Sequence, residues 1–285
     1  TEVHFYSISS KGEDIPVTVL SEVNDIFAPV PAEAWLAPVQ DRQDRIEQLF
    51  QLLLDLHASE GAKGLNTGPE YLRNGSAFSA ALTAAAYSLG NHGGRILAFQ
   101  SSLPSLGIGK TSCREEMKVY GRHEETEYWF SDPSLPSYKR LGKFCAENQI
   151  CVDIISAVEG HGELATLSLV PQKTGGELIH YQSFKGGSAY DEHRLREDIF
   201  RLLCSNVALE AVLKIRCSEG LRVFAVHGPG YVKGDASEVN IAAVGEDLTF
   251  VATFEYTQDI EDERSNAFLQ VSLLHTTLEG KRCVR

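Results

Sequence analysis

The chain has 285 residues with 43% hydrophobic and 23% charged side chains, which is typical of a globular protein with one large domain or two smaller ones. No apolar run approaches the roughly 18 residues of a membrane-spanning helix, and no secretory signal opens the sequence. The net charge of −13 argues against a nucleic-acid-binding protein, because phosphate backbones attract positive surfaces. The chain begins at Thr1, without a methionine and directly before a predicted strand, so we expect a fragment of a longer protein.

The first half of the chain combines short strands with amphipathic helices. Alternating side chains predict two antiparallel strands over residues 3–8 and 15–20. Apolar residues at helical spacing predict a helix over residues 40–59, and a run of small residues predicts another over residues 76–89 that packs closely against a sheet. The apolar run within residues 95–100 predicts a strand buried on both faces, in the middle of a parallel sheet.

Helices and strands then alternate before the pattern changes. After a long hydrophilic segment we expect helices over residues 135–147, 163–170 and 191–205 and strands over residues 150–155 and 177–181. Such alternation predicts an α/β fold with a doubly wound, largely parallel sheet. Later segments alternate without a helical period, over residues 209–217, 221–227, 238–242, 248–256 and 267–277. We therefore predict an α/β domain over residues 1–206 and an antiparallel β-sandwich or barrel segment over residues 207–285.

The segment Gly107–Ser112, with the sequence Gly-Ile-Gly-Lys-Thr-Ser, has the ending of a nucleotide-binding P-loop. The motif needs a glycine where this chain has Pro104, and proline has no amide hydrogen to donate to a phosphate. No helix-forming run follows Lys110. We therefore predict a surface loop, with a nucleotide hydrolase as an alternative that nucleotide-dependent thermal stabilisation would support.

Patterns typical of catalytic and metal sites are missing from the sequence. The six cysteines form no Cys-x-x-Cys pair, and the nine histidines form no His-x-x-x-His spacing, which predicts reduced, buried thiols and no metal site. There is no Gly-x-Ser-x-Gly motif and no telling pair of carboxylates. Asp153, alone in a predicted buried strand, is interpreted as structural. The sequence therefore predicts a protein that is not an enzyme.

Two cations stand side by side on one predicted strand in the second half of the chain. Alternation sends Leu213, Ile215 and Cys217 to one face, and it sends Lys214 and Arg216 to the other. One interpretation is the solvated outer face of a barrel, with an acidic partner on a neighbouring strand. The other is a clamp for a ligand carboxylate, which the planar guanidinium of arginine suits.

Leu274 is an apolar residue on a mostly polar face of a later strand. In that strand we expect the core face to consist of Leu269, Val271 and Leu273. Leu274 then points the other way, and a single exposed leucine is in itself normal. If folding brings Leu274 near the two cations, the three residues would form a pocket for an acidic and apolar peptide.

Several longer strings carry a family resemblance. They are Asp25-Ile26-Phe27-Ala28-Pro29-Val30-Pro31, Gly75-Ser76-Ala77-Phe78, Phe99-Gln100-Ser101-Ser102-Leu103-Pro104-Ser105-Leu106-Gly107, Tyr138-Lys139-Arg140-Leu141, Thr174-Gly175-Gly176 and Lys214-Ile215-Arg216-Cys217-Ser218-Glu219-Gly220-Leu221. The strings keep their order over most of the chain and leave out only about residues 111–133. In them the chain resembles the cargo-adaptor family of the COPII vesicle coat.

The resemblance implies a von Willebrand A-like trunk followed by part of a β-barrel or β-sandwich, without enzymatic activity. It implies a heterodimer with the GTPase-activating subunit of the inner coat, peripheral contact with the endoplasmic reticulum membrane, and binding of sorting signals from cargo and SNARE proteins. The expected location is the cytoplasm, at endoplasmic reticulum exit sites and on COPII vesicles. Zinc is expected in the family's zinc ribbon upstream of the trunk, and no cofactor is expected within this chain.

By motif position, the resemblance assigns the recognition of acidic signals to Lys214, Arg216 and Leu274, the residues that alternation singles out. Lys214 stands where the family usually has arginine, so this position offers a point charge rather than a planar fork. The alternative is a metal-dependent ligand-binding module of the A-domain class. That module needs an Asp-x-Ser-x-Ser loop, which the chain lacks, so Ser76 could supply only a secondary ligand.

Overall fold

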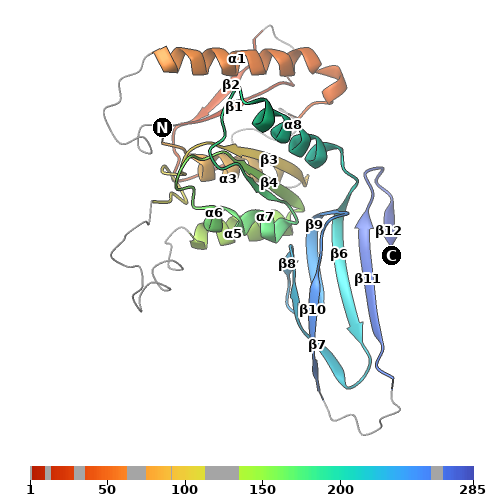
Figure 1. Cartoon of the computed structure of the whole chain (residues 1–285). Helices are drawn as coiled ribbons and strands as arrows, with labels where there is room; N and C mark the ends of the chain where they lie inside the picture. The colour runs from red at the N-terminus through yellow and green to blue at the C-terminus, as the bar shows by residue number, and fades with distance from the viewer. Residues whose placement is uncertain are drawn as a thin grey trace, which may run out of the picture. The chain divides into compact units, whose positions relative to one another are not determined.

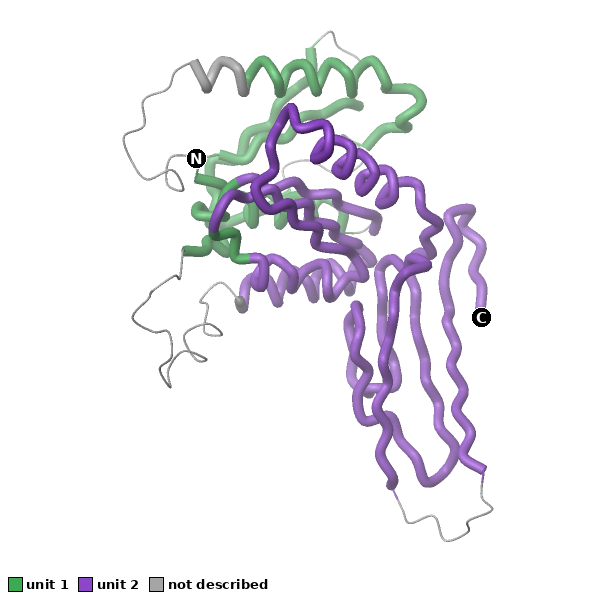
Figure 2. The backbone as a smooth tube through the Cα atoms, in the orientation of Figure 1, with its two compact units in different colours: residues 1–91, 102–134, 161–163 green, residues 92–101, 135–160, 164–285 purple. Residues whose placement is uncertain are grey.

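The computed structural model describes residues 2–9, 14–28, 36–62, 75–90, 92–112, 135–257 and 266–285. The chain forms two compact units (Figure 2), the first with residues 1–91, 102–134 and 161–163 and the second with residues 92–101, 135–160 and 164–285. The predicted domain boundary after residue 206 lies inside the second unit and stays a prediction. All three predicted site residues belong to the second unit.

The first unit is built from a pair of strands and from helices. Its elements are β1 (Val3–Tyr6), β2 (Val17–Leu20), the short 3-10 helix η2 (Val39–Asp41), α1 (Gln43–Ala62) and α3 (Phe78–Leu89). β1 and β2 pair antiparallel with Val3 opposite Leu20, as the alternation predicts. Both residues are buried against Ala80 and Ala84, whose small side chains let α3 lie close to the strand pair.

The glycine-rich segment that resembles the end of a P-loop forms a turn closed by its own backbone hydrogen bonds. The amide of Thr111 donates to the Pro104 carbonyl at 2.6 Å, and the amide of Lys110 donates to the Gly107 carbonyl at 3.2 Å. Gly107 has a φ of +75°, and a Cβ there would lie 2.6 Å from the carbonyl oxygen of Val23. Because these amides are occupied within the protein, the segment has the bonding of a structural loop rather than of a phosphate cradle.

A three-stranded parallel sheet with helices on both faces forms the first part of the second unit. Its elements are β3 (Gly94–Gln100), α5 (Leu135–Glu147), β4 (Ile150–Ser156), α6 (Leu164–Leu167), α7 (Leu169–Thr174), β5 (Leu178–His180) and α8 (Ala189–Cys204). The strand order is β3-β4-β5, and Figure 1 shows α5, α6 and α7 on one face of the sheet and α8 on the other. This arrangement confirms the predicted α/β fold with a doubly wound sheet.

The middle strand of this sheet is β4 and not β3. Every residue of β4 is buried, whereas β3 lies at an edge of the described sheet and its Phe99 side chain is 58% exposed. The prediction that residues 95–100 form a central strand buried on both faces is therefore wrong. An apolar run indicates that a strand is largely covered, but it does not indicate which neighbours cover it.

A buried ion pair ties the sheet to α8. Asp153 in β4 is fully buried and accepts hydrogen bonds from Nε of Arg95 in β3 and from the amide of Glu177, the latter at 2.9 Å. Arg95 also donates from Nη1 to the carbonyl of Leu202 in α8 at 2.7 Å. Both oxygens of the buried carboxylate are thus hydrogen-bonded, as a buried charge requires. These contacts support the interpretation of Asp153 as structural.

An antiparallel β-sandwich forms the rest of the second unit. Its strands in the described part of the chain are β6 (Val207–Cys217), β7 (Leu221–His227), β8 (Tyr231–Val232), β9 (Glu238–Gly245), β10 (Val251–Tyr256), β11 (Leu269–Thr276) and β12 (Arg282–Val284). One sheet has the order β12-β11-β6-β9-β8, and the other pairs β10 with β7. As far as these strands go, the sheets do not close into a barrel, which decides between the two predicted architectures.

A bulge at Glu210 divides β6 between two packing environments. Glu210 has a φ of +49°, which is uncommon for a residue with a side chain, and the register against β11 shifts there. Before the bulge, Val207 and Leu209 pack against Cys151 of β4, and after it Leu213 is buried in the sandwich core. An extra residue turns the following side chains to the other face. One strand can therefore cover both the α/β sheet and the sandwich core.

The inner face of β11 is only partly covered. Leu273 packs against the sandwich core, but Leu269 and Val271 are 53% and 63% exposed. The prediction that Leu269 and Val271 belong to the core is therefore wrong, although both point toward the inner side of the sheet, opposite Cys217 and Ile215. Alternation predicts the face on which a side chain lies, and it cannot predict whether a second sheet reaches that face.

Candidate functional site

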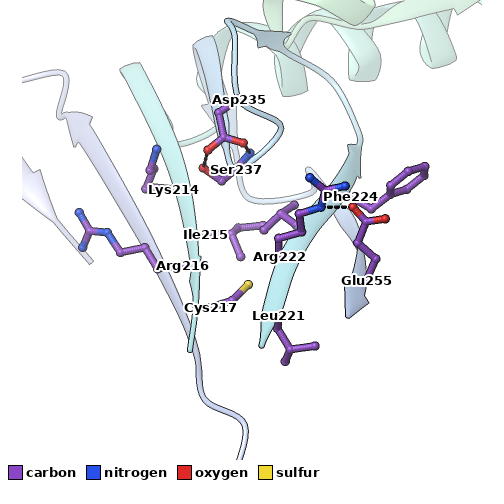
Figure 3. Close-up of a pocket in the computed structure, with 11 residues that line it drawn as sticks. Lys214, Ile215, Arg216, Cys217, Leu221, Arg222, Phe224, Asp235, Ser237 and Glu255 are labelled. Carbon is purple, nitrogen blue, oxygen red and sulfur yellow. Dashed lines mark hydrogen bonds and ion pairs between the residues drawn. The ribbon is translucent and has the colours of Figure 1, made fainter. Parts of the chain in front are cut away.

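The two predicted cations lie on the outer face of β6, away from the sandwich core. Leu213 and Ile215 are buried on the inner side of this strand. Figure 3 shows Ile215 and Cys217 pointing from β6 toward β7, with Lys214 and Arg216 on the other side of the strand. The alternation of side chains along β6 is thus the predicted one.

Leu274 lies on the same face as the two cations. In the antiparallel pairing of β6 with β11, the opposed residues are Arg216 with Gln270, Lys214 with Ser272 and Val212 with Leu274. Directly opposed residues share a face, so Leu274 is one diagonal step from Lys214, about 7–8 Å between such positions. The fold therefore brings the three predicted residues together on one surface.

Apolar side chains continue this surface beyond Lys214. Val212 and Leu274 are half-buried and face each other across the strands, and the exposed Val284 of β12 lies opposite Leu274 on its other side. We call this set the outer face: Val212, Lys214, Arg216, Leu274 and Val284. It has a basic end at Arg216 and an apolar end at Leu274 and Val284.

Lys214 has an acidic partner on the neighbouring strand. Its Nζ lies 3.1 Å from Oε2 of Glu238, the residue opposite it in β9. Asp235 is also near, and its pKa is lowered mainly by hydrogen bonds from the hydroxyl and the amide of Ser237, at 2.5 and 3.2 Å, and to a lesser degree by the charge of Lys214. Lys214 therefore has the acidic neighbour that the solvated-face interpretation predicts.

Arg216 differs from Lys214 in its surroundings. The side chain is exposed, and its Nη1 lies 3.4 Å from Oε1 of Gln270. Within the described ranges no carboxylate forms an ion pair with Arg216, and the neutral amide of Gln270 leaves its charge uncompensated. The guanidinium can therefore donate two parallel hydrogen bonds to a ligand carboxylate.

A hollow of about 630 Å³ lies beside the outer face, between β6 and β7 (Figure 3). Lys214 and Arg216 border it, and the ion pair between Arg222 and Glu255 lines it from the second sheet. Leu274 is not among its lining residues. The three predicted site residues thus share an open surface and are not enclosed together in one pocket.

Sequence reasoning missed several members of this surface. Val212 follows the same alternation as Lys214 and Arg216, so the period-two pattern could have included it. Glu238 and Val284 reach the outer face only through the pairing of β9 and β12 with their neighbours. No local signal in the sequence specifies that register.

The described residues offer few groups for metal or thiol chemistry. Among them, no three His, Cys, Asp or Glu side chains gather closely enough to hold a metal ion, and no helix is both long and apolar enough to cross a membrane. Cys145 and Cys151 are buried and unbonded, as predicted, but the thiol of Cys204 is exposed. Cys113 lies outside the described residues.

Two family models together match almost the whole chain. The model of the Sec23/Sec24 trunk domain matches residues 1–203, and the model of the Sec23/Sec24 beta-sandwich domain matches residues 208–285. The chain belongs to the Sec23/Sec24 family. The resemblance seen in the sequence motifs is thereby confirmed, while the finer likeness of the trunk to von Willebrand A domains stays a prediction.

Known members of the Sec23/Sec24 family resemble the chain over its full length. It is 29% identical to the protein transport protein SEC24 of Komagataella pastoris, over 100% of this chain and 29% of that protein. It is 28% identical to SEC24 A of Arabidopsis thaliana, over 99% of this chain and 26% of that protein. The crystal structure of the human COPII-coat protein Sec24c matches with a TM-score of 0.84 and 26% identity, over 99% of this chain and 36% of that one. The chain spans less than two fifths of the length of each of these relatives.

Proposed function

We propose that this chain is part of a COPII coat subunit without enzymatic activity, whose outer face binds cytosolic sorting signals of cargo and SNARE proteins. The observation that carries the proposal is the common face of Lys214, Arg216 and Leu274, which follows from the register of β6 and β11. The coat role is supported by the relatives, since human Sec24c is a COPII-coat protein and the SEC24 proteins are protein transport proteins.

The outer face suits an extended peptide with an acidic and an apolar residue. Arg216 and Val212 are four positions apart on one strand, which corresponds to about 13 Å at roughly 3.3 Å per residue. Arg216 can hold a carboxylate through a bidentate contact, and Leu274 and Val284 offer apolar surface at the other end. A peptide whose carboxylate and apolar side chain are about four residues apart can contact both ends at once.

The role of the whole protein is proposed from the family. We expect a heterodimer with the GTPase-activating subunit of the inner coat and a cytoplasmic location at endoplasmic reticulum exit sites and on COPII vesicles, for transport to the Golgi. Contact with the endoplasmic reticulum membrane is expected to be peripheral. The net charge of −13 gives no reason to expect a nucleic-acid partner.

Peptide binding to charge-reversed variants tests the outer face. A fluorescently labelled peptide ending in an acidic-apolar signal is titrated with the wild-type chain and with the Lys214→Glu/Arg216→Glu variant. We expect the variant to bind at least about tenfold more weakly, because the ligand carboxylate then meets two like charges. Lys185→Glu/Arg196→Glu makes the same change at two exposed positions that are not part of the outer face. This control should keep its affinity, and equal affinities of the wild type and the outer-face variant would refute the assignment.

A further inference from the structure

Four cations surround a second hollow, at α5, α7 and the turn between β7 and β8. The basic hollow measures about 510 Å³, and its cations are Lys139, Arg140 and Lys143 of α5 and Lys173 of α7. The described residues that line it include no carboxylate. In a chain with a net charge of −13, such a local excess of positive charge is a candidate binding site for an anion.

A glycine brings the two helices of the basic hollow close together. A Cβ at Gly142 would lie 3.0 Å from Cδ of Lys173 and 3.2 Å from the carbonyl oxygen of Leu169. The missing side chain therefore lets α7 approach α5 and lets the Lys173 stem cross α5 at this position. Gly142 lies between Lys139 and Lys143, so the three lysines converge on one hollow.

The opposite wall of the basic hollow is fixed by the turn that leads into β8. The amide of Gly230 donates to the Gln172 carbonyl at 2.7 Å, which ties this turn to α7. Gly230 has a φ of +132°, and a Cβ there would lie 2.7 Å from Cγ1 of Val239, so only glycine fits. The next residue, Tyr231, holds the Lys173 ammonium 5.5 Å from its ring centroid. The wall is therefore in place before any ligand arrives.

The charges of the basic hollow are poorly compensated. Lys143 has a long, exposed contact with Glu147 at 3.8 Å, of the kind that contributes little. None of the ion pairs in the described part of the chain involves Lys139, Arg140 or Lys173. Lys139 and Lys143 are four positions apart on one helix, where like charges repel. A ligand with several negative charges would neutralise all four cations and relieve this repulsion. A single carboxylate would neutralise only one of them.

We propose that the basic hollow binds a multiply phosphorylated headgroup of the inositol phosphate class, either free or carried by a lipid. Its volume is within the range of small-molecule sites. The three lysines would contact phosphates as point charges, and Arg140 would contact them through its planar fork. The site does not depend on the outer face. If the headgroup is carried by a lipid, the basic hollow would also contribute to the peripheral membrane contact proposed above.

Calorimetric titration of the whole chain with inositol hexakisphosphate tests the basic hollow. The variant Lys139→Gln/Lys143→Gln is compared with Lys185→Gln/Arg196→Gln, which removes two charges from exposed positions outside the hollow. We expect about tenfold weaker binding for the first variant and less than about twofold for the second. Lys143→Arg keeps the charge and should bind like the wild type.

Sedimentation with phosphatidylcholine vesicles, with and without a phosphatidylinositol bisphosphate, separates the two sources of the headgroup. Sedimentation that requires both this lipid and the two lysines supports a lipid ligand. Binding of inositol hexakisphosphate without sedimentation on these vesicles supports a free inositol phosphate. The proposal is overturned if hexakisphosphate does not bind or if both charge-removal variants weaken its binding equally. A phosphoserine peptide that binds through these lysines without hexakisphosphate binding would also overturn it. The sorting-signal peptide is tested with changes at Lys214 and Arg216 and the phosphate ligand with changes at Lys139 and Lys143, so failure here is distinguishable from failure of the outer face.

Discussion

Removal of the Glu238 carboxylate should strengthen the binding of an acidic peptide to the outer face. This carboxylate lies 3.1 Å from Nζ of Lys214, and the side chains of the lysine and the glutamate are 31% and 40% exposed. A ligand carboxylate that binds Lys214 has to displace the Glu238 carboxylate. Ion pairs at this level of exposure contribute about 0.2–1 kcal/mol, which corresponds to a roughly 1.4- to fivefold change in an equilibrium constant. Glu238→Gln should therefore tighten peptide binding by up to about fivefold.

The same fluorescent-peptide titration measures this effect at low and at high ionic strength. The gain should shrink with added salt, because exposed charges are screened over about 8–10 Å at physiological ionic strength. Glu246→Gln serves as the matched control, since it removes an exposed carboxylate that accepts a hydrogen bond from Asn206 at 2.9 Å. Unchanged or weaker binding by Glu238→Gln would show that Glu238 does not compete with the ligand, and Lys214 would then have no direct part in binding.

Three further predictions concern the α/β part of the second unit. Asp153→Asn should lower the free energy of unfolding by about 3–5 kcal/mol, because it leaves a partly buried guanidinium without its counter-charge. Arg201→Gln breaks a more exposed pair and should cost about 1 kcal/mol or less in the same urea titration, so equal losses would contradict the reasoning. Burial raises the pKa of the Cys145 and Cys151 thiols to about 12, so iodoacetamide at mildly alkaline pH should label the exposed Cys204 and spare both until the chain unfolds. The unfolded thiols ionise near pH 9.0 and the folded ones only near 12, so the contribution of the two buried thiols to the free energy of unfolding should be complete below pH 9.0 and be lost as the pH rises toward 12. A free energy of unfolding that stays constant over this range would refute the pKa assignment.

The long elements were predictable because each repeats its own period several times. α5 and β4 begin and end within one residue of the predicted bounds, since a helical and an apolar pattern run along their whole length. β8 and β12 were missed because strands of two and three residues are too short to show a period. The bulge at Glu210 was also missed, because it depends on the register of the neighbouring strands.

The candidate site divides in the same way. Lys214 and Arg216 were predictable as a pair because two positions on one strand need only the period of that strand. The sequence pattern put Leu274 on a polar face, but its distance from the cations depended on how β11 pairs with β6. Glu238 was not predicted because the residue that opposes Lys214 is set by the register of β9. The face on which a side chain lies can thus be predicted from the sequence of its own strand. The residues that oppose it on neighbouring strands cannot.

The two cations of the outer face are not equivalent, and this difference limits the signals that the face can recognise. Lys214 already has Glu238 at 3.1 Å, so a ligand carboxylate gains there only the difference between two similar ion pairs. Arg216 has no carboxylate partner in the described ranges and can form a bidentate contact.

The apolar end of the outer face begins one step beyond Lys214, at Val212 and Leu274. A peptide therefore gains most when its carboxylate lies at Arg216 and its apolar side chain lies about four residues away. An acidic residue directly beside the apolar one would instead meet the like charge of Glu238. The outer face should thus discriminate by the order and spacing of acidic and apolar residues rather than by total charge.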